Sequence, residues 1–125
     1  MFLKTLEKYY LVDMGIRNQL TGLRDTDYGH MLENIVYLEL IRRGYAVTIG
    51  KIGPVEVDFV ATKSNEKIYY QVSATILDEQ TLKRELRPLQ AIKDNYPKVI
   101  LTMDQPVFDD YSGIRTQNIL DFLLE

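Results

Sequence analysis

The sequence predicts one α/β domain with an α-β-β-β-α-β core, in which helices flank a central mixed sheet. Three consecutive stretches alternate apolar and polar residues, which is the period of half-buried strands. Segments before and after them repeat apolar residues every three or four positions, as amphipathic helices do. With 125 residues, 46% of them hydrophobic and 26% charged, the chain suits a single globular domain.

The first 25 residues are expected to form an attachment segment, followed by the domain proper over residues 26–125. Tyr9 to Val12 favours a short strand, and Asp13 can cap a brief helix over Met14 to Leu20. No internal repeat and no Pro/Gly/Ser-rich linker divides the chain. We therefore expect one structural unit.

The first long helix of the domain is expected from about Gly29 to Arg43, with Gly44 ending it. Inside the second long helix, Pro88 predicts a kink or a break, because proline has no N–H to donate. After the first helix we expect three strands, the second helix, a strand, a short strand and a terminal helix, over about residues 45–50, 55–61, 67–76, 78–94, 99–103, 114–117 and 119–124.

Polar residues interrupt two neighbouring predicted strands. In the strand expected over about residues 55–61, alternation places Val57 and Phe59 on one face and Asp58 on the other. In the strand expected over about residues 67–76, Gln71 and Ser73 share a face. If the two strands pair as a hairpin, Asp58, Gln71 and Ser73 share one polar face, as the parts of a site would. The structural alternative for Asp58 is a solvated residue on an exposed sheet face.

The first helix carries a second unusual carboxylate, Glu33. Its neighbours one and two turns ahead are apolar: Val36, Tyr37 and Leu40. An unpaired carboxylate in such surroundings costs free energy or has a raised pKa, so a cation, a metal ion or several donors should lie near it. The structural alternative is a pairing of Glu33 with Arg42 or Arg43 from a neighbouring element, or with a loop amide.

These residues carry a resemblance. The element order, with Glu33 in the first helix, Asp58 in the second strand and a polar pair in the third, resembles the PD-(D/E)xK, or restriction-endonuclease-like, nuclease superfamily. Several long phrases also resemble the uncharacterised domain found C-terminal to an AAA-type P-loop ATPase module in many prokaryotic ATPases. The phrases are YYLVDMGIRNQL, LENIVYLELIRRGY, EVDFVA, YYQVSATI, LKRELRPLQAIKDNYPKVILTMD and GIRTQNILDFLL. The resemblance implies a P-loop ATPase module as partner, in the same or a related chain.

The superfamily pattern assigns its helix glutamate to Glu33, its strand aspartate to Asp58 and its E-x-K element to Gln71 and Ser73. It thereby implies these four as the catalytic positions, and Glu33, Asp58 and Gln71 as ligands of Mg²⁺. Gln71 lacks the charge of glutamate and Ser73 lacks the cation of lysine. We therefore expect weak Mg²⁺ binding and a degenerate site, since losing the lysine alone costs roughly 10²–10⁴ in rate.

Cations on the second helix are the candidate nucleic-acid contacts: Lys83, Arg84 and Arg87. Such side chains anchor phosphates without reading bases, so binding through them would weaken with salt. Lys83 is also the first candidate to replace the missing catalytic lysine. The alternative is that these cations balance Glu79 and Glu85 on the helix surface.

Composition excludes several classes of site. The chain has no cysteine, so disulfides and thiolate zinc sites are excluded, and its single histidine, His30, excludes a multi-histidine metal site. A net charge of -3 gives no overall electrostatic case for nucleic acid. The absence of a secretory apolar run and of any apolar stretch near 18 residues predicts a cytoplasmic protein without a membrane partner.

The sequence thus favours a C-terminal domain of an AAA-type ATPase, with a degenerate nuclease-like site that serves nucleic-acid binding or partner recognition. The alternatives are an active Mg²⁺-dependent DNA nuclease and a pure protein-interaction module of an ATPase. No other cofactor is expected, and the oligomeric state stays open. In the structure, the carboxylates of Glu33 and Asp58 should lie about 4–7 Å apart, with Gln71 beside them.

Overall fold

One six-stranded sheet lies between helices. The computed structural model describes residues 25–105 and 110–125; the strand and brief helix expected within residues 9–20 lie outside these ranges. The described elements are α2 (Asp25–Arg42), β1 (Ala46–Ile52), β2 (Val55–Lys63), β3 (Glu66–Ser73), α3 (Glu79–Gln90), β4 (Lys98–Thr102), β5 (Asp110–Tyr111), β6 (Ile114–Asn118) and α4 (Ile119–Leu124).

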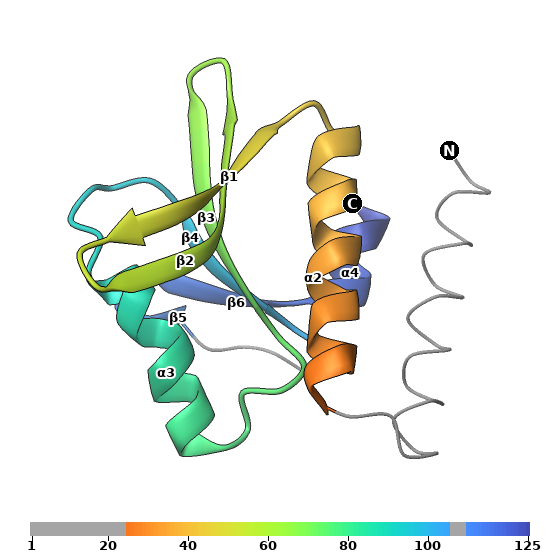
Figure 1. Cartoon of the computed structure of the whole chain (residues 1–125), viewed down its shortest axis with the longest axis vertical. Coiled ribbons are helices and arrows are strands. Elements are labelled where there is room, and N and C mark those ends of the chain that lie inside the picture. Colours follow the sequence, from red (N-terminus) through yellow and green to blue (C-terminus); the bar gives the residue numbers. More distant parts are fainter. Residues whose placement is uncertain (1–24, 106–109) are drawn as a thin grey trace.

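The sheet is mixed, with the strand order β1-β2-β3-β4-β6-β5. β1, β2 and β3 pair antiparallel in sequence, β3 pairs parallel with β4, and β4 pairs parallel with β6. α2 and α4 cover one face of the sheet and α3 covers the other (Figure 1). The α/β class and the α-β-β-β-α-β order are therefore confirmed. Within the described ranges, no helix combines the length and apolar character needed to span a bilayer.

The core has two apolar clusters, one on each face of the sheet. The cluster beneath α2 and α4 includes Leu32, Val36, Leu40, Tyr70, Val72 and Phe122. The cluster beneath α3 includes Val57, Val60, Tyr69, Leu86, Leu89 and Ile100. Because helices cover both faces, the polar face expected on β2 and β3 lies inside the protein, where Gln71 is only 4% exposed.

The second long helix is shorter than its sequence pattern predicts. Asp78 caps it, and the Asp78 carboxylate accepts a hydrogen bond from the backbone N–H of Thr81. α3 ends at Gln90 rather than near Asp94. Pro88 has no N–H for the carbonyl four residues earlier, and the helix continues for only two more residues. The helix thus ends two residues after Pro88 rather than at Pro88.

A β-bulge in β2 changes the faces that strict alternation predicts. Thr48 pairs with Val60 and Gly50 pairs with Val57, so β2 has one residue more than β1 in this interval. Both Val57 and Val60 belong to the cluster under α3, whereas Phe59 packs against the cluster under α2. The expectation that Val57 and Phe59 share a face is wrong, because the extra residue rotates the strand.

Gly50 of β1 faces the bulge at very short range. A Cβ atom at Gly50 would lie 2.7 Å from Cγ2 of Val60 and 3.3 Å from Cβ of Val57. Both valines of the bulge therefore occupy the space that any other residue would need at this position. Gly50 therefore lets β1 stay paired with β2 on both sides of the bulge.

A buried ion-pair cluster connects α2 with the C-terminal helix α4. Glu39 is 0% exposed and receives hydrogen bonds of 2.7 Å from Nη2 of Arg42 and from Nε of Arg43. Arg43 also donates to the backbone carbonyl of Phe122 and lies 4.3 Å above the centroid of its ring. The paired charges satisfy the buried carboxylate.

Candidate functional site

Asp58 and Gln71 hold β2 and β3 together at the bulge through their side chains. The residue pairing between the two strands runs from the hairpin turn to Phe59 and Tyr70. One step further, the N–H of Asp58 donates to Oε1 of Gln71 at 2.8 Å. The N–H of Val72 donates to Oδ2 of Asp58 at 2.9 Å. Two side chains thus accept the hydrogen bonds that backbone carbonyls would accept in a regular ladder.

The amide of Gln71 also reaches the helix above the sheet. Its Nε2 donates to the backbone carbonyl of Glu85 at 3.2 Å. Gln71 therefore connects β2, β3 and α3, with its oxygen directed at the N–H of Asp58 and its nitrogen at α3. A glutamate at this position would have no N–H for the carbonyl of Glu85. We assign Gln71 a positioning role.

Glu85 is a site residue that the sequence pattern did not reveal. Its side chain is 14% exposed. The pKa of Glu85 is raised to about 7, chiefly by burial and also by the negative charges of Asp58 and Glu33, against the opposing effect of nearby Arg84. We had expected Glu85 only to balance surface cations.

A signal for Glu85 was present in the sequence. Glu85 lies three residues after Leu82 and four before Leu89, so it shares the apolar stripe of α3 that faces the sheet. A carboxylate within an apolar stripe is a candidate buried site residue, as Glu33 is on α2.

Glu33 and Asp58 share the electrostatic environment of Glu85. Burial raises the pKa of Glu33, the charge of Asp58 raises it further, and His30 lowers it. Burial likewise raises the pKa of Asp58, although the hydrogen bond from Val72 lowers it. Glu33, Asp58 and Glu85, called the acidic group below, thus bring negative charges from α2, β2 and α3 into mutual influence. The structural alternative of an arginine partner for Glu33 differs from what is found, since Arg42 and Arg43 bind Glu39.

The acidic group does not form a closed set of metal ligands. Among the residues that the structure describes, no three or more His, Cys, Asp or Glu side chains are spaced to hold one metal ion. One oxygen of Asp58 and the oxygen of Gln71 already accept backbone N–H groups. A tightly held resident metal does not fit this arrangement. A hydrated dication that meets one or two carboxylates is the weaker form of binding that remains chemically reasonable.

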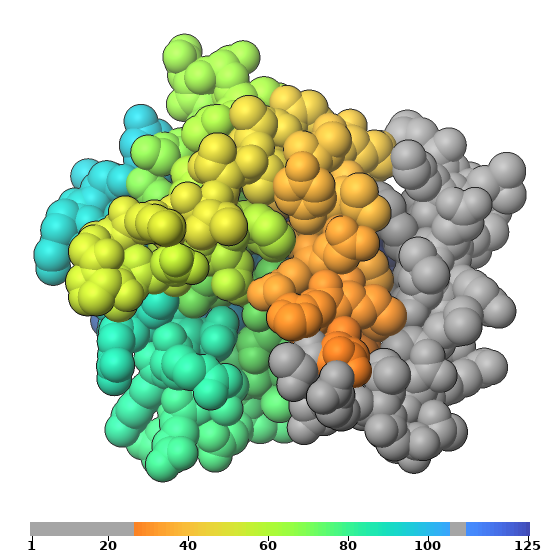
Figure 2. All heavy atoms as spheres, in the orientation of Figure 1, coloured from red at the N-terminus to blue at the C-terminus, as the bar shows by residue number. Residues whose placement is uncertain are grey.

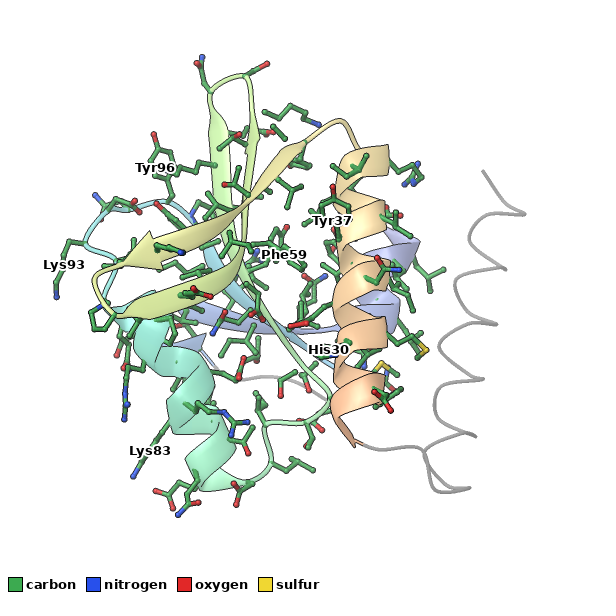
Figure 3. All side chains as sticks on the ribbon, in the orientation of Figure 1. His30, Tyr37, Phe59, Lys83, Lys93 and Tyr96 are labelled. Atoms are coloured by element: carbon green, nitrogen blue, oxygen red, sulfur yellow. The ribbon has the colours of Figure 1, made fainter. Side chains whose placement is uncertain are left out.

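The position of the missing lysine holds no cation. Oγ of Ser73 donates to the backbone carbonyl of Thr75 at 2.8 Å, within its own segment. Lys83, the candidate replacement, lies 3.4 Å from the carboxylate of Glu79, and both side chains are exposed on α3. Figure 3 shows Lys83 directed away from the body of the protein. Arg87 on α3 is also exposed.

One comparison with known proteins found a longer relative of this chain. In a comparison with protein-family models, none matches the chain. An uncharacterised protein of Haemophilus influenzae is 41% identical over 124 residues, which is 99% of this chain and 30% of that protein. The chain therefore corresponds to about a third of the length of a larger protein.

Proposed function

We propose that this domain is the C-terminal domain of an AAA-type ATPase, and that its nuclease-like site is degenerate and serves nucleic-acid binding or partner recognition. The observation that carries the proposal is the pair of side-chain acceptors between β2 and β3: Gln71 accepts from the N–H of Asp58, and Asp58 accepts from the N–H of Val72. The strand aspartate of the superfamily pattern is in place, while its glutamate and lysine are replaced by Gln71 and Ser73.

The electrostatics of the acidic group support a site that has lost its chemistry. Phosphoryl transfer by a metal-dependent nuclease needs positive charge where negative charge develops. Here the pKa values of Glu33, Asp58 and Glu85 are all raised, chiefly by burial, and Ser73 supplies no cation. The phosphate of a nucleic acid would therefore be held away from the acidic group, by cations on α3.

The length of the similar protein supports the proposal that the domain belongs to a larger protein with a second module. The Haemophilus influenzae protein is long enough to hold a further module, since this chain spans 30% of it. The resemblance of the long sequence phrases supplies the identity that we propose for that module, a P-loop ATPase.

Binding and cleavage assays on the domain test the proposal. We expect single-stranded or duplex DNA to bind weakly and with strong salt dependence, and Arg87→Gln to reduce both the affinity and the salt slope. Arg115→Gln is the control of matched charge, because Arg115 is exposed on β6, on another part of the sheet. With Mg²⁺, the unmodified domain should show negligible cleavage.

Efficient Mg²⁺-dependent cleavage that is lost in Glu33→Gln would contradict the proposal and establish an active nuclease. Glu33 is a sharper test than Asp58, because replacing Asp58 also removes the acceptor for the N–H of Val72. If DNA does not bind, and an adjoining ATPase is fully active only with this domain attached, the domain is a protein-interaction module. The double change of Gln71→Glu and Ser73→Lys should yield measurable nicking if the superfamily alignment is correct.

A further inference from the structure

A pocket of about 350 Å³ lies at the opposite end of β3 from Ser73, away from the position of the missing lysine. It forms between the β1–β2 hairpin, the start of β3 and the segment that follows α3. Figure 2 shows β1 and β2 above α3 on one face of the molecule, with the segment after α3 at their outer edge. The lining residues that matter for its chemistry are Lys51, Lys67, Lys93, Tyr69, Ile92 and Asp94.

The floor of this pocket is apolar. It consists of members of the cluster under α3 together with side chains that pack against that cluster, namely Ile52, Val57, Val60, Tyr69 and Ile92. Gly50 adds no side chain to it. A flat, weakly polar group such as a nucleobase can therefore rest on the floor, while its polar substituents stay at the rim.

The rim of the pocket is positive. In the two described ranges, neither Lys67 nor Lys93 forms an ion pair, and Lys51 has only a distant, exposed partner in Glu56 at 3.9 Å. The one carboxylate of the lining, Asp94, is already occupied. It accepts hydrogen bonds from the hydroxyl of Tyr69 at 2.5 Å and from Nζ of Lys98 at 3.3 Å.

Two aromatic rings position the ammonium group of Lys67. Its Nζ lies 5.4 Å from the ring centroid of Tyr69 and 5.6 Å from that of Tyr96. Tyr69 is buried, whereas Tyr96, which lies beside the pocket next to Lys67 rather than in its lining, is 44% exposed. Figure 3 shows Tyr96 and Lys93 on the same side of the molecule, both from the segment that follows α3.

We propose that this pocket binds a nucleotide, with its phosphate at Lys67 and Lys93 and its base against the apolar floor and Tyr96. Lysine ammonium groups bind phosphate as point charges, and exposed aromatic rings stack on bases of any sequence. The nucleotide belongs either to a nucleic-acid strand or to a free nucleotide. The strand as a source rests on the proposed function; the pocket itself does not.

Titrations with two probes distinguish these sources: AMP, and a single-stranded oligothymidylate. Amide chemical shifts in NMR spectra report the location, and we expect changes around residues 50–52 and 91–94. Loss of one charged phosphate contact should weaken binding about tenfold in Lys67→Gln and in Lys93→Gln. Tyr96→Ala should weaken it at least about fivefold, and Tyr96→Phe should keep it. Arg115→Gln is again the control of matched charge.

Binding of the oligonucleotide but not AMP at these amides identifies a strand as the ligand, and binding of both identifies the nucleotide unit alone. The proposal is overturned if neither probe shifts these amides, or if Lys67→Gln and Arg115→Gln weaken binding equally. The same titration separates this proposal from the role of the α3 cations. If Lys67→Gln weakens oligonucleotide binding and Arg87→Gln leaves it unchanged, the result contradicts the role of α3 and supports the pocket.

Discussion

Replacing Glu85 by glutamine should stabilise the protein at alkaline pH. The pKa of Glu85 in the folded protein is about 7, above its ordinary value of 4.5. Between these two values the folded state binds more protons than the unfolded chain, so stability falls as the pH rises through this window. The charge of Glu85 therefore costs most at about pH 8, and nothing at about pH 4, where the side chain is neutral in both states.

The size of this effect follows from the shift. A rise from 4.5 to about 7 corresponds to at most about 3 kcal/mol of lost stability. Solvent screens part of the charge, so we expect Glu85→Gln to gain about 1–2 kcal/mol at about pH 8 and to be nearly neutral at about pH 4. Glutamine has the same shape without the charge.

Urea unfolding, followed by far-ultraviolet circular dichroism at both pH values, measures the difference. Glu79→Gln serves as the control, because Glu79 is an exposed residue of the same helix and pairs with exposed Lys83. It should change stability by less than about 0.5 kcal/mol at either pH. A Glu85→Gln variant that gains nothing at alkaline pH, or that changes stability equally at both pH values, would refute the reasoning.

Two further predictions concern the packing around the site. Gly50→Ala should destabilise the fold by about 1–3 kcal/mol, because the new methyl group overlaps the side chains of the bulge. The control Gly29→Ala, with open space in α2, should stabilise the fold by about 1 kcal/mol. Equal shifts of the two variants in thermal unfolding would contradict the prediction for Gly50. Glu39→Gln should cost about 3 kcal/mol, because Arg43 loses its buried counter-charge, and Lys83→Gln is the exposed control. A cost below about 1 kcal/mol, as for an exposed pair, would show that solvent replaces the pair.

Apart from the two-residue β5, the described elements were predictable from local pattern, because apolar periodicity is set by the faces that each element buries. The faces of the residues around Asp58 were not predictable, since a bulge depends on the partner strand. Gly50, eight residues before Asp58, provides the space that lets Val57 and Val60 both face α3. The pairing of Asp58 with Gln71 followed from the hairpin. The hydrogen bonds from the N–H of Asp58 to Gln71 and from the N–H of Val72 to Asp58 did not, because they arise only where the two strands depart from regular pairing.

Buried charge was predicted unevenly for a similar reason. Glu33 stood out because its helical neighbours are apolar. Glu39, which is fully buried, was not predicted as a buried charge: Arg42 and Arg43, three and four residues later, would pair with it equally well on an exposed helix face. A sequence pattern shows which charges are near along a helix, but the depth of the pair depends on α4, which packs there from the other end of the chain.

The hydrogen bond between β2 and β3 that the Asp58 side chain accepts makes one backbone amide report on the state of that side chain. The N–H of Val72 exchanges with solvent hydrogen only when the carboxylate of Asp58 releases it. A proton, a cation or a ligand that engages Asp58 must compete with this N–H for the same oxygen or draw the carboxylate aside. The exchange rate of one amide thus reports the state of Asp58 without any assay of activity, and it distinguishes a local opening between β2 and β3 from unfolding of the whole domain.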